Sequence, residues 1–388
     1  MRFKATRMFT RKRVSAIESP ARITWKRFKK HKAGYFALWL ILFMAAIALF
    51  AYWLIPDKST HANRQILEIT TQKPGFEADF LLVSKEMPAR KKTLFATLLS
   101  GRPDTAFYVP FDSLWIQQDS VYLKLFDPER TGQLTLTYPL SQFRLAAQPQ
   151  DEAIESLRKH YVVKKRFLLG TDQFGRDMLS RLVLGARISL SVGFIAVLIS
   201  LVVGITLGSL GGFFGGKTDD FVMWLVNVVW SLPTLLMVIA ITFALGKGFW
   251  QVFVAVGLTM WVEVTRVVRG QILSVRESYF VDAARALGFN NVRIIIRHIL
   301  PNVISPVIVI SAANFASAIL IEAGLSFLGL GVQPPTPSWG SMIKENYAFI
   351  ILDAAYLAIL PGIAIMLLVL AFMLVGNALR EALDVKKL

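Results

Sequence analysis

The chain is dominated by a series of long apolar runs. Six of them are long enough to cross a bilayer, which takes about 20 apolar residues. They cover Gly34–Ile55, Ile188–Gly212, Phe221–Leu245, Phe249–Val268, Val303–Leu330 and Ala354–Leu374. Backbone polar groups in lipid need internal partners, so each run is expected to be a helix. Pro233, inside the third run, removes one backbone bond and is expected to kink that helix.

The segment between the first two runs follows a different pattern. It has short alternating runs at Gln65–Gln72, Ser113–Phe126 and Gln133–Leu145, with turn signals at Pro74-Gly75, Gly101, Pro128 and Thr131-Gly132. Aromatic residues and leucine are plentiful there, which argues against a disordered linker. We therefore expect an all-α polytopic membrane protein with an inserted β-rich extracytoplasmic domain over residues 56–165. One helix of that insert is expected near Asp151–His160.

The distribution of charge indicates on which side of the membrane the N-terminal segment lies. Hydrophobic residues make up 54% of the sequence and charged residues 18%, yet the net charge is +17. A basic protein can bind nucleic acid, but here many of the cations lie in residues 1–33, directly before the first apolar run. They are Arg2, Lys4, Arg7, Arg11, Lys12, Arg13, Arg22, Lys26, Arg27, Lys29, Lys30 and Lys32. This is typical of a cytoplasmic anchor beside anionic lipid, so no nucleic-acid partner is expected.

The same charge bias gives an orientation. The apolar run 34–55 is longer than the core of a signal peptide and no small-residue cleavage site follows it, so a retained helix is expected. Six spans then return the C-terminus to the cytoplasm of an inner-membrane, multi-pass protein. The loop between the fourth and fifth spans also falls inside and is rich in arginine, as the positive-inside rule requires. The expected organisation is a basic segment 1–33, a first helix 34–55, the external insert 56–165 and a five-helix core 166–388.

The sharpest motif lies in the cytoplasmic loop 270–301. It reads Val281-Asp282-Ala283-Ala284-Arg285-Ala286-Leu287-Gly288-Phe289 and, after a short gap, Arg297-His298-Ile299-Leu300-Pro301-Asn302. The pattern predicts a helix with small residues that ends at Gly288, then a second helix that stops at Pro301. A face of small residues lets a groove of another protein approach closely. An ordinary amphipathic helix at the membrane surface is the alternative.

This loop resembles the coupling loop of ABC-importer permeases, which docks into a cleft of the ATPase subunit. The family pattern has Glu-Ala-Ala, a glycine four residues on, and later Ile-x-Leu-Pro; here Asp282 replaces the Glu and His298 the Ile. The resemblance implies a docking role for seven residues: Asp282, Ala283, Ala284, Arg285, Gly288, Leu300 and Pro301. The departure at His298 leaves the packing of the second helix open.

Two further stretches resemble the C-type permease of dipeptide, oligopeptide and nickel importers. They run from Leu169 to Leu190 (beginning LGTDQFGRDMLSR) and from Glu322 to Gly340 (beginning EAGLSFLGLG). With Trp25–Leu42, they extend the likeness over Trp25–Ile55 and Phe167–Asp384, and leave the insert uncovered. The resemblance implies a transport subunit that is not itself an enzyme and moves its substrate by alternating access.

The same resemblance implies the partners. They are a second homologous permease, two ABC ATPase subunits that use ATP and magnesium, and an extracytoplasmic substrate-binding protein; this chain itself binds no cofactor. Short peptides are the expected substrate, with nickel or another small solute as the alternative. A membrane sensor with an external ligand-binding domain is the alternative of another class.

A second motif invites a different reading. Gly211–Thr218 fits the phosphate-loop pattern G-x-x-x-x-G-K-[ST], which would make the chain an ATPase that uses Lys217. A phosphate loop follows a buried strand and opens a helix, whereas this one follows a long apolar span. We therefore expect a tight cytoplasmic turn, with Asp219 and Asp220 capping the third helix.

Polar residues within or beside the spans are the candidates for a pathway or gate. A carboxylate inside a span is costly and usually faces a cavity or a partner, so Glu322 and, two turns earlier, Asn314 are expected to line the pathway or bond at a gate. Hydrogen bonding between helices is the alternative. Arg176 and Asp177, before the second span, are expected to form a salt-bridged external gate or docking surface, or else to cap an interfacial helix.

Other polar and small residues have structural explanations. Glu263 and Arg266 can pair across one helical turn. Gly204, Gly208 and Gly212 recur every four residues, which is typical of close helix packing in membranes. The histidines His31, His61, His160 and His298 lack metal-ligand spacing and the chain has no cysteine, so no metal site and no catalytic group are expected.

Overall fold

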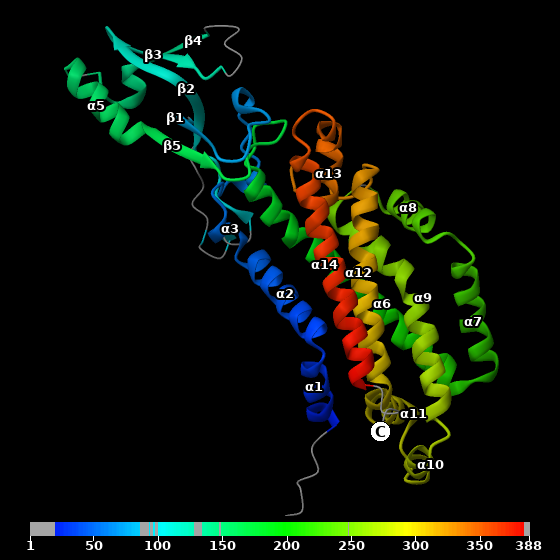
Figure 1. The fold of residues 1–388 in the computed structure, drawn as a ribbon. Helices are drawn as coiled ribbons and strands as arrows, with labels where there is room; N and C mark the ends of the chain where they lie inside the picture. Colours follow the sequence, from blue (N-terminus) through cyan, green and yellow to red (C-terminus); the bar gives the residue numbers. More distant parts are fainter. Residues whose placement is uncertain are drawn as a thin grey trace, which may run out of the picture.

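The computed structural model describes residues 20–85, 93, 96–97, 100–127, 134–146, 149–246 and 248–383. A bundle of long helices carries a small β-sheet at one end (Figure 1). The basic residues of 1–19 and the expected turns at Pro128 and Thr131-Gly132 lie outside the described residues.

The helices follow the apolar runs closely. Their bounds are α1 Pro20–Lys30, α2 Lys32–Leu49, α3 Ala51–Leu54, α5 Gln150–Tyr161, α6 Met178–Phe214, α7 Gly216–Trp230, α8 Thr234–Leu245, α9 Phe249–Val275, α10 Tyr279–Ala286, α11 Asn291–Arg293, α12 Leu300–Phe327, α13 Trp339–Asn346 and α14 Tyr356–Leu383. In the described part of the chain, five continuous helical segments are long and apolar enough to cross a membrane. A sixth crossing requires α7 and α8 to be taken together.

The third span differs from the single kinked helix that we expected. Helices α7 and α8 meet at 93°, and Pro233 is the N-cap residue of α8. The proline ring disfavours helical backbone at the preceding residue, Leu232, so the chain leaves the helix there instead of bending within it. The expectation of a kink was therefore wrong in degree: the span is broken.

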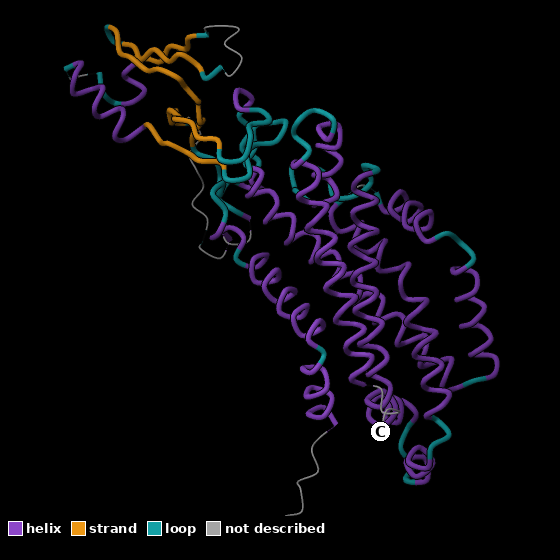
Figure 2. The backbone as a smooth tube through the Cα atoms, in the orientation of Figure 1, coloured by secondary structure: helices purple, strands orange, loops and turns teal. Residues whose placement is uncertain are grey.

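The insert contains a five-stranded sheet whose order is β4-β3-β2-β1-β5, with every neighbouring pair antiparallel. The strands are β1 Phe76–Ser84, β2 Ala106–Gln117, β3 Ser120–Leu125, β4 Thr135–Pro139 and β5 Val162–Phe167. Residue Leu81 of β1 lies opposite Val109 of β2 and Val162 of β5. Helix α5 buries Ala153 and Leu157 in the cluster of apolar side chains formed with the strands. The backbone of α5 lies beside the sheet (Figure 2).

The expected strands were only partly right. The run Gln65–Gln72 holds a single 3₁₀ turn, Leu67–Ile69, and not a strand. The run Ser113–Phe126 is divided between β2 and β3 by a tight turn in which Gln118 has a positive φ of 53°. The run Gln133–Leu145 supplies β4 and then a 3₁₀ turn. The helix near Asp151–His160 is present as α5, whereas β1 and β5 were not anticipated.

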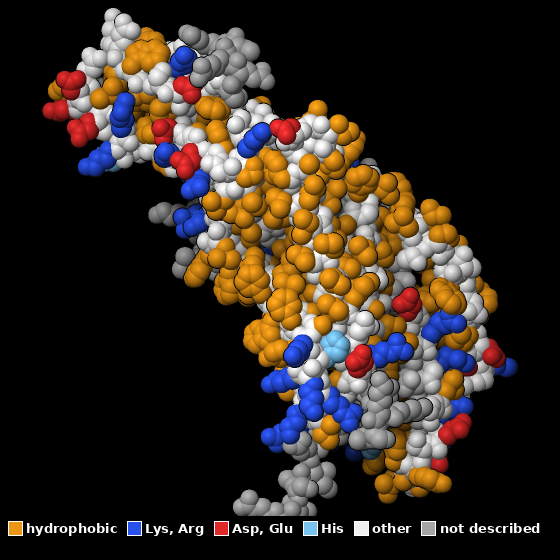
Figure 3. All heavy atoms as spheres, viewed as in Figure 1, with side chains coloured by type: hydrophobic (Ala, Val, Ile, Leu, Met, Phe, Trp, Pro, Cys, Tyr) orange, Lys and Arg blue, Asp and Glu red, His pale blue; other side chains and the backbone are white. Residues whose placement is uncertain are grey.

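The two ends of the bundle have different character. The sheet and α13 lie at one end, and α1, α10 and α11 lie at the other (Figure 1). On the face shown in Figure 3, hydrophobic side chains cover the middle of the helical part, and Lys and Arg side chains gather near the α1 end. This is the distribution expected of a membrane protein whose basic end faces the cytoplasm.

Close packing of α6 against α9 forms the centre of the bundle. A Cβ atom built on Gly204 would lie 2.5 Å from the Cβ of Val264, and one on Gly208 would lie 2.8 Å from the Cβ of Val268. Gly212 meets α9 in the same way at Ile272. The prediction that these glycines form a helix-packing face is confirmed, because any side chain there would separate the two helices.

Candidate functional site

The loop expected to dock onto an ATPase contains the short helix α10, which lies between α9 and α11. Val281 and Ala284 are buried in an apolar cluster with residues of α6, of α9 and of the helical segment that follows. The opposite side is open: Tyr279 is 94% exposed and Leu287 72% exposed. Asp282, Ala283 and Arg285 lie on this exposed side, so the chain presents a mixed apolar and charged surface at its basic end. Ala284 faces inward and supports the helix from beneath.

The end of α10 is a left-handed cap. Gly288 has φ +76°; its N–H donates to the carbonyl of Arg285 at 2.9 Å, and the N–H of Phe289 donates to that of Ala284 at 3.2 Å. These two bonds make a Schellman motif, which closes a helix where a glycine can adopt positive φ. The expected end of the helix at Gly288 is confirmed.

The second helix of the loop does not stop at Pro301. Instead α11, a π-helical turn over Ile294–Ile299 and α12 form one continuous helical segment from Asn291 to Phe327. In the π turn the N–H of Leu300 donates to the carbonyl of Ile295, five residues back. Pro301 has no N–H to donate, and the π turn just before it already interrupts the regular hydrogen bonds of the α-helix. The proline is therefore tolerated in the first turn of α12.

His298 has a definite packing partner. Its ring stacks on Phe289 with 5.7 Å between the centroids and 13° between the planes, so it fixes the chain that leaves α10 against the following helix. The open question about the second helix is thereby answered: the histidine supports the connection between the two halves of the loop.

At the sheet end, Arg176 belongs to a buried network of four charges. Its Nε lies 2.6 Å from Asp172 and its Nη2 lies 2.5 Å from Glu345 of α13. Arg181 also reaches Glu345, at 3.2 Å. Two cations and two carboxylates therefore tie the segment before α6, and the first turn of α6 itself, to α13. The expected salt bridge exists, but its acidic partners are Asp172 and Glu345 and not the adjacent Asp177.

Asp177 caps α6. Its carboxylate accepts a hydrogen bond from the backbone N–H of Ser180 at 2.9 Å, which is the helix-capping alternative. Burial raises the pKa of this carboxyl, while the bonds from Ser180 oppose the rise. Asp177 lines a cavity of 280 Å³ together with Arg64 and Lys165. Burial and the nearby charge of Arg64 lower the pKa of Lys165 to about 8.

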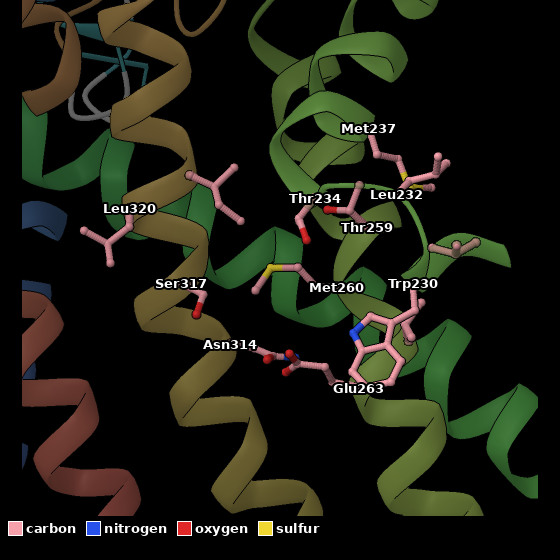
Figure 4. Close-up of a pocket in the computed structure, with 13 residues that line it drawn as sticks. Trp230, Leu232, Thr234, Met237, Thr259, Met260, Glu263, Asn314, Ser317 and Leu320 are labelled. Carbon is pink, nitrogen blue, oxygen red and sulfur yellow. The ribbon is translucent and has the colours of Figure 1, made fainter. Parts of the chain in front are cut away.

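A half-open cavity of 350 Å³ lies between helices of the bundle (Figure 4). It is lined by residues of α7, the α7–α8 break, α8, α9 and α12. Asn314 extends from α12 toward Glu263 on α9, with Trp230 beside the carboxylate. Asn314 is 2% exposed and its side-chain nitrogen has no hydrogen-bond partner among the described residues. The expectation that Asn314 faces a cavity agrees with this arrangement.

A second cavity of 980 Å³ is lined by residues of α9, α12 and α14, and Glu263 lines both spaces. Its polar lining includes Gln271, Ser305 and Asn377, and Arg380 of α14 adds a positive charge. The two cavities share Glu263 in their lining, and we refer to them together as the track.

Glu322 has a different environment. It is fully buried and its Oε1 accepts a hydrogen bond from Ser326 at 2.7 Å. The Ser338 hydroxyl lies 3.3 Å from that of Ser326 and forms the N-cap of α13. Glu322 is not among the described residues that line the two cavities of the track. This geometry favours the alternative, hydrogen bonding between structural elements, over pathway lining.

Two smaller expectations were wrong. Asp219 and Asp220 do not cap α7, because its N-cap residue is Gly215 and makes no side-chain bond. Asp219 lies in the first turn of the helix, and its carboxylate binds Arg269 of α9, with Nη2 to Oδ2 at 2.5 Å. Glu263 and Arg266 form no ion pair in the described part of the chain, because Arg266 lies over the Trp230 ring at 3.9 Å.

The phosphate-loop pattern occupies a turn between helices. Helix α6 ends at Phe214, Gly215 has φ +66°, and α7 begins at Gly216. A long helix precedes the pattern where a phosphate loop requires a strand. Among the described residues no group of three or more His, Asp or Glu side chains could hold a metal ion.

Comparison with known proteins decides the family. Residues 204–387 match the family "binding-protein-dependent transport system inner membrane component", and residues 19–74 match the "N-terminal TM domain of oligopeptide transport permease C". A dipeptide transport system permease protein, DppC, of Alkalihalophilus pseudofirmus is 43% identical over 217 residues, which cover 56% of this chain and 71% of the relative. The chain belongs to the C-type permease subunits of ABC peptide importers.

Other relatives agree with this assignment. A di/tripeptide permease of Pseudomonas aeruginosa is 43% identical over 57% of this permease and 73% of the relative. A glutathione transport system permease of Pectobacterium atrosepticum is 41% identical over 56% of this permease and 72% of the relative. Among solved structures, the inward-facing MetNI methionine ABC transporter is similar at 18% identity and a TM-score of 0.45, covering 53% of this permease and 98% of that chain.

The permease is a transport subunit and not an enzyme. Sequence reasoning singled out the loop 270–301 from its motif and Asn314 from its polarity within a span. It assigned Glu263 to a pairing that does not exist and so missed its place in the track. The signal was present, because a carboxylate in a span is costly unless it faces a cavity or a partner.

Proposed function

We propose that this permease carries short peptides across the inner membrane as one half of a translocation pathway. The observation that carries the proposal is the pair of cavities that share Glu263, one of which is also lined by Asn314, in a chain whose relatives are named as dipeptide, di/tripeptide and glutathione permeases. A homologous permease would supply the other half, and a binding protein would deliver the peptide at the sheet end. Nickel is the less favoured substrate, since the track offers no cluster of metal ligands among its described residues.

Energy would enter through α10. Its exposed side, with Tyr279, Asp282 and Arg285, is suited to a cleft of an ATPase subunit that binds ATP and magnesium. Val281 and Ala284 pack beneath it on the residues that lead into α12, so a displacement of α10 passes directly to the helix that bears Asn314. In this arrangement both termini are cytoplasmic and the sheet domain is extracytoplasmic.

The test is reconstitution of the permease with its partner permease, ATPase subunits and binding protein in proteoliposomes. We expect ATP-dependent accumulation of a labelled dipeptide or tripeptide, and none of radioactive nickel. Accumulation of nickel without peptide would show that the substrate is nickel and not a peptide. Binding of peptide without any ATP-dependent accumulation would favour the sensor alternative.

The sheet domain is expected to contact the binding protein or the partner permease. Replacing residues 85–161 by a short linker removes most of the domain while it leaves the charge network of Arg176 in place. If the shortened permease supports uptake at the full rate, the domain has no part in delivery.

A further inference from the structure

Glu263 occupies a position that its helix does not explain. Its carboxylate is exposed toward the two cavities from the middle of α9, a membrane-spanning helix. Neither an ion pair nor a hydrogen bond joins it to any of the described residues. Its nearest cation along the helix, Arg266, is engaged by the Trp230 ring at 3.9 Å. A carboxylate that is left without a partner in a span is costly, so this one is retained for something that passes it.

Asn314 supplies the second polar group. Its side-chain nitrogen is a buried donor without a partner, on a residue that is only 2% exposed. Figure 4 shows the Asn314 amide and the Glu263 carboxylate pointing toward one another across the cavity. A buried donor without an acceptor costs about 1–3 kcal/mol, and an occupant with a carbonyl oxygen would satisfy it.

Together, the Glu263 carboxylate and the Asn314 amide fit a ligand that offers a cation and a carbonyl oxygen close to each other. A carboxylate accepts from an ammonium, and an amide N–H₂ donates to a carbonyl. An ammonium and a carbonyl one carbon apart are what the free amino end of a peptide presents. The cavity volume of 350 Å³ lies within the range of ligand sites, and the apolar walls formed by Trp230, Met237 and Met260 can accommodate a side chain.

Resting on the proposed function, we propose that Glu263 and Asn314 form a subsite that recognises the free amino terminus of the peptide in transit. Glu263 holds the ammonium and Asn314 the first carbonyl. Arg380, at the wall of the larger cavity, is the one other charged residue in the described lining. Its positive charge can attract the C-terminal carboxylate of the peptide as the peptide moves into the larger cavity.

The experiment compares uptake by Glu263→Gln and by the wild-type complex in proteoliposomes as a function of external pH. The α-amino group of a peptide loses its proton near pH 7.7–8.0, whereas the guanidinium groups of Arg266 and Arg380 stay charged. We expect the wild-type rate to exceed the variant rate about tenfold at pH 6.5, which corresponds to about 1.4 kcal/mol. The ratio should fall below about twofold at pH 9.5, where little ammonium remains.

Taking the ratio removes the pH dependence of the binding protein and of the ATPases, which both complexes share. Glu263→Asp should retain the pH-dependent ratio, since it keeps the charge. Asn314→Leu should lower uptake by a similar factor at both pH values, because it removes the contact with the carbonyl. Glu381→Gln is the matched control: this carboxylate lies on α14, is 65% exposed, faces His31 at 3.8 Å and should leave uptake unchanged.

A Glu263→Gln rate equal to wild type at both pH values would overturn the proposal. A reduction that is the same at pH 6.5 and pH 9.5 would also overturn it, since a structural role does not depend on the charge of the peptide. Failure of the wild-type complex to accumulate any peptide would instead refute the proposed function, so the two failures are distinguishable.

Discussion

Gly288 offers the sharpest test of the coupling helix, because two substitutions at this position separate backbone shape from bulk. Its φ of +76° and the bonds from Gly288 and Phe289 to Arg285 and Ala284 close α10. Proline fixes φ near −65° and has no N–H, so Gly288→Pro cannot form the cap. Two bonds of about 1 kcal/mol each are lost, and the left-handed turn is abolished. The total penalty is about 3 kcal/mol or more, confined to the loop between α9 and α12.

Gly288→Ala is the matched control. An added Cβ meets nothing within 4 Å, and alanine in the left-handed region costs about 1–2 kcal/mol while both backbone bonds remain. We expect Gly288→Pro to insert in the membrane and assemble, yet to lose the stimulation of ATP hydrolysis by loaded binding protein. Gly288→Ala should keep most of that stimulation. Normal stimulation in Gly288→Pro would refute the assignment of α10 as the coupling helix.

Three further predictions concern stability, measured as the thermal unfolding midpoint in mild detergent. Glu345→Gln leaves the buried arginine network with an unbalanced charge, so its midpoint should fall by several degrees, while exposed Glu381→Gln should not change it. Gly208→Leu places a side chain against the α9 backbone and should destabilise by about 1–3 kcal/mol, unlike Gly270→Leu, whose Cβ meets nothing within 4 Å. The pKa of Lys165 is lowered to about 8 in the folded protein, so above pH 8 the unfolded chain binds more protons than the folded one. The free energy of unfolding should therefore rise from pH 8 to 10. A wild-type stability that does not change over this range, or the same rise in Lys165→Met, would contradict this.

The apolar pattern predicted the helices well because a lipid environment leaves the backbone few choices. The cap at Gly288 was also predictable, since its signal is local: a run of helix formers followed by the residue that adopts positive φ most easily. The packing face of Gly204, Gly208 and Gly212 could be found because spacing by four residues places small side chains on one side of a helix.

What the sequence could not supply depends on partners far along the chain. Pro301 resembles a stop signal, and the π turn that lets the helix continue through it is visible only in the hydrogen-bond pattern. Arg176 stands beside Asp177 in sequence, yet one of its two acidic partners, Glu345, is 169 residues away. Strands β1 and β5 were missed because their pairing, and not their composition, makes them strands. Glu263 was predicted to pair with Arg266 because the two residues are three apart on a helix. Local spacing cannot reveal that the Arg266 guanidinium lies over the Trp230 ring instead.

Because β1 pairs with β5, the part of the insert between them could be exchanged for another domain. Leu81 and Val162 are direct neighbours in the sheet although the chain makes a long excursion between them, so the excursion begins and ends at nearly one point, about 5 Å across. Beside that point, Phe80 of β1 and Phe167 of β5 remain in contact with 6.1 Å between their ring centroids, which holds the two strands together at the base of the excursion. The site therefore suits protein engineering: a fluorescent or affinity module of matching end-to-end spacing could replace the outer strands and report on the transporter from the sheet end of the bundle.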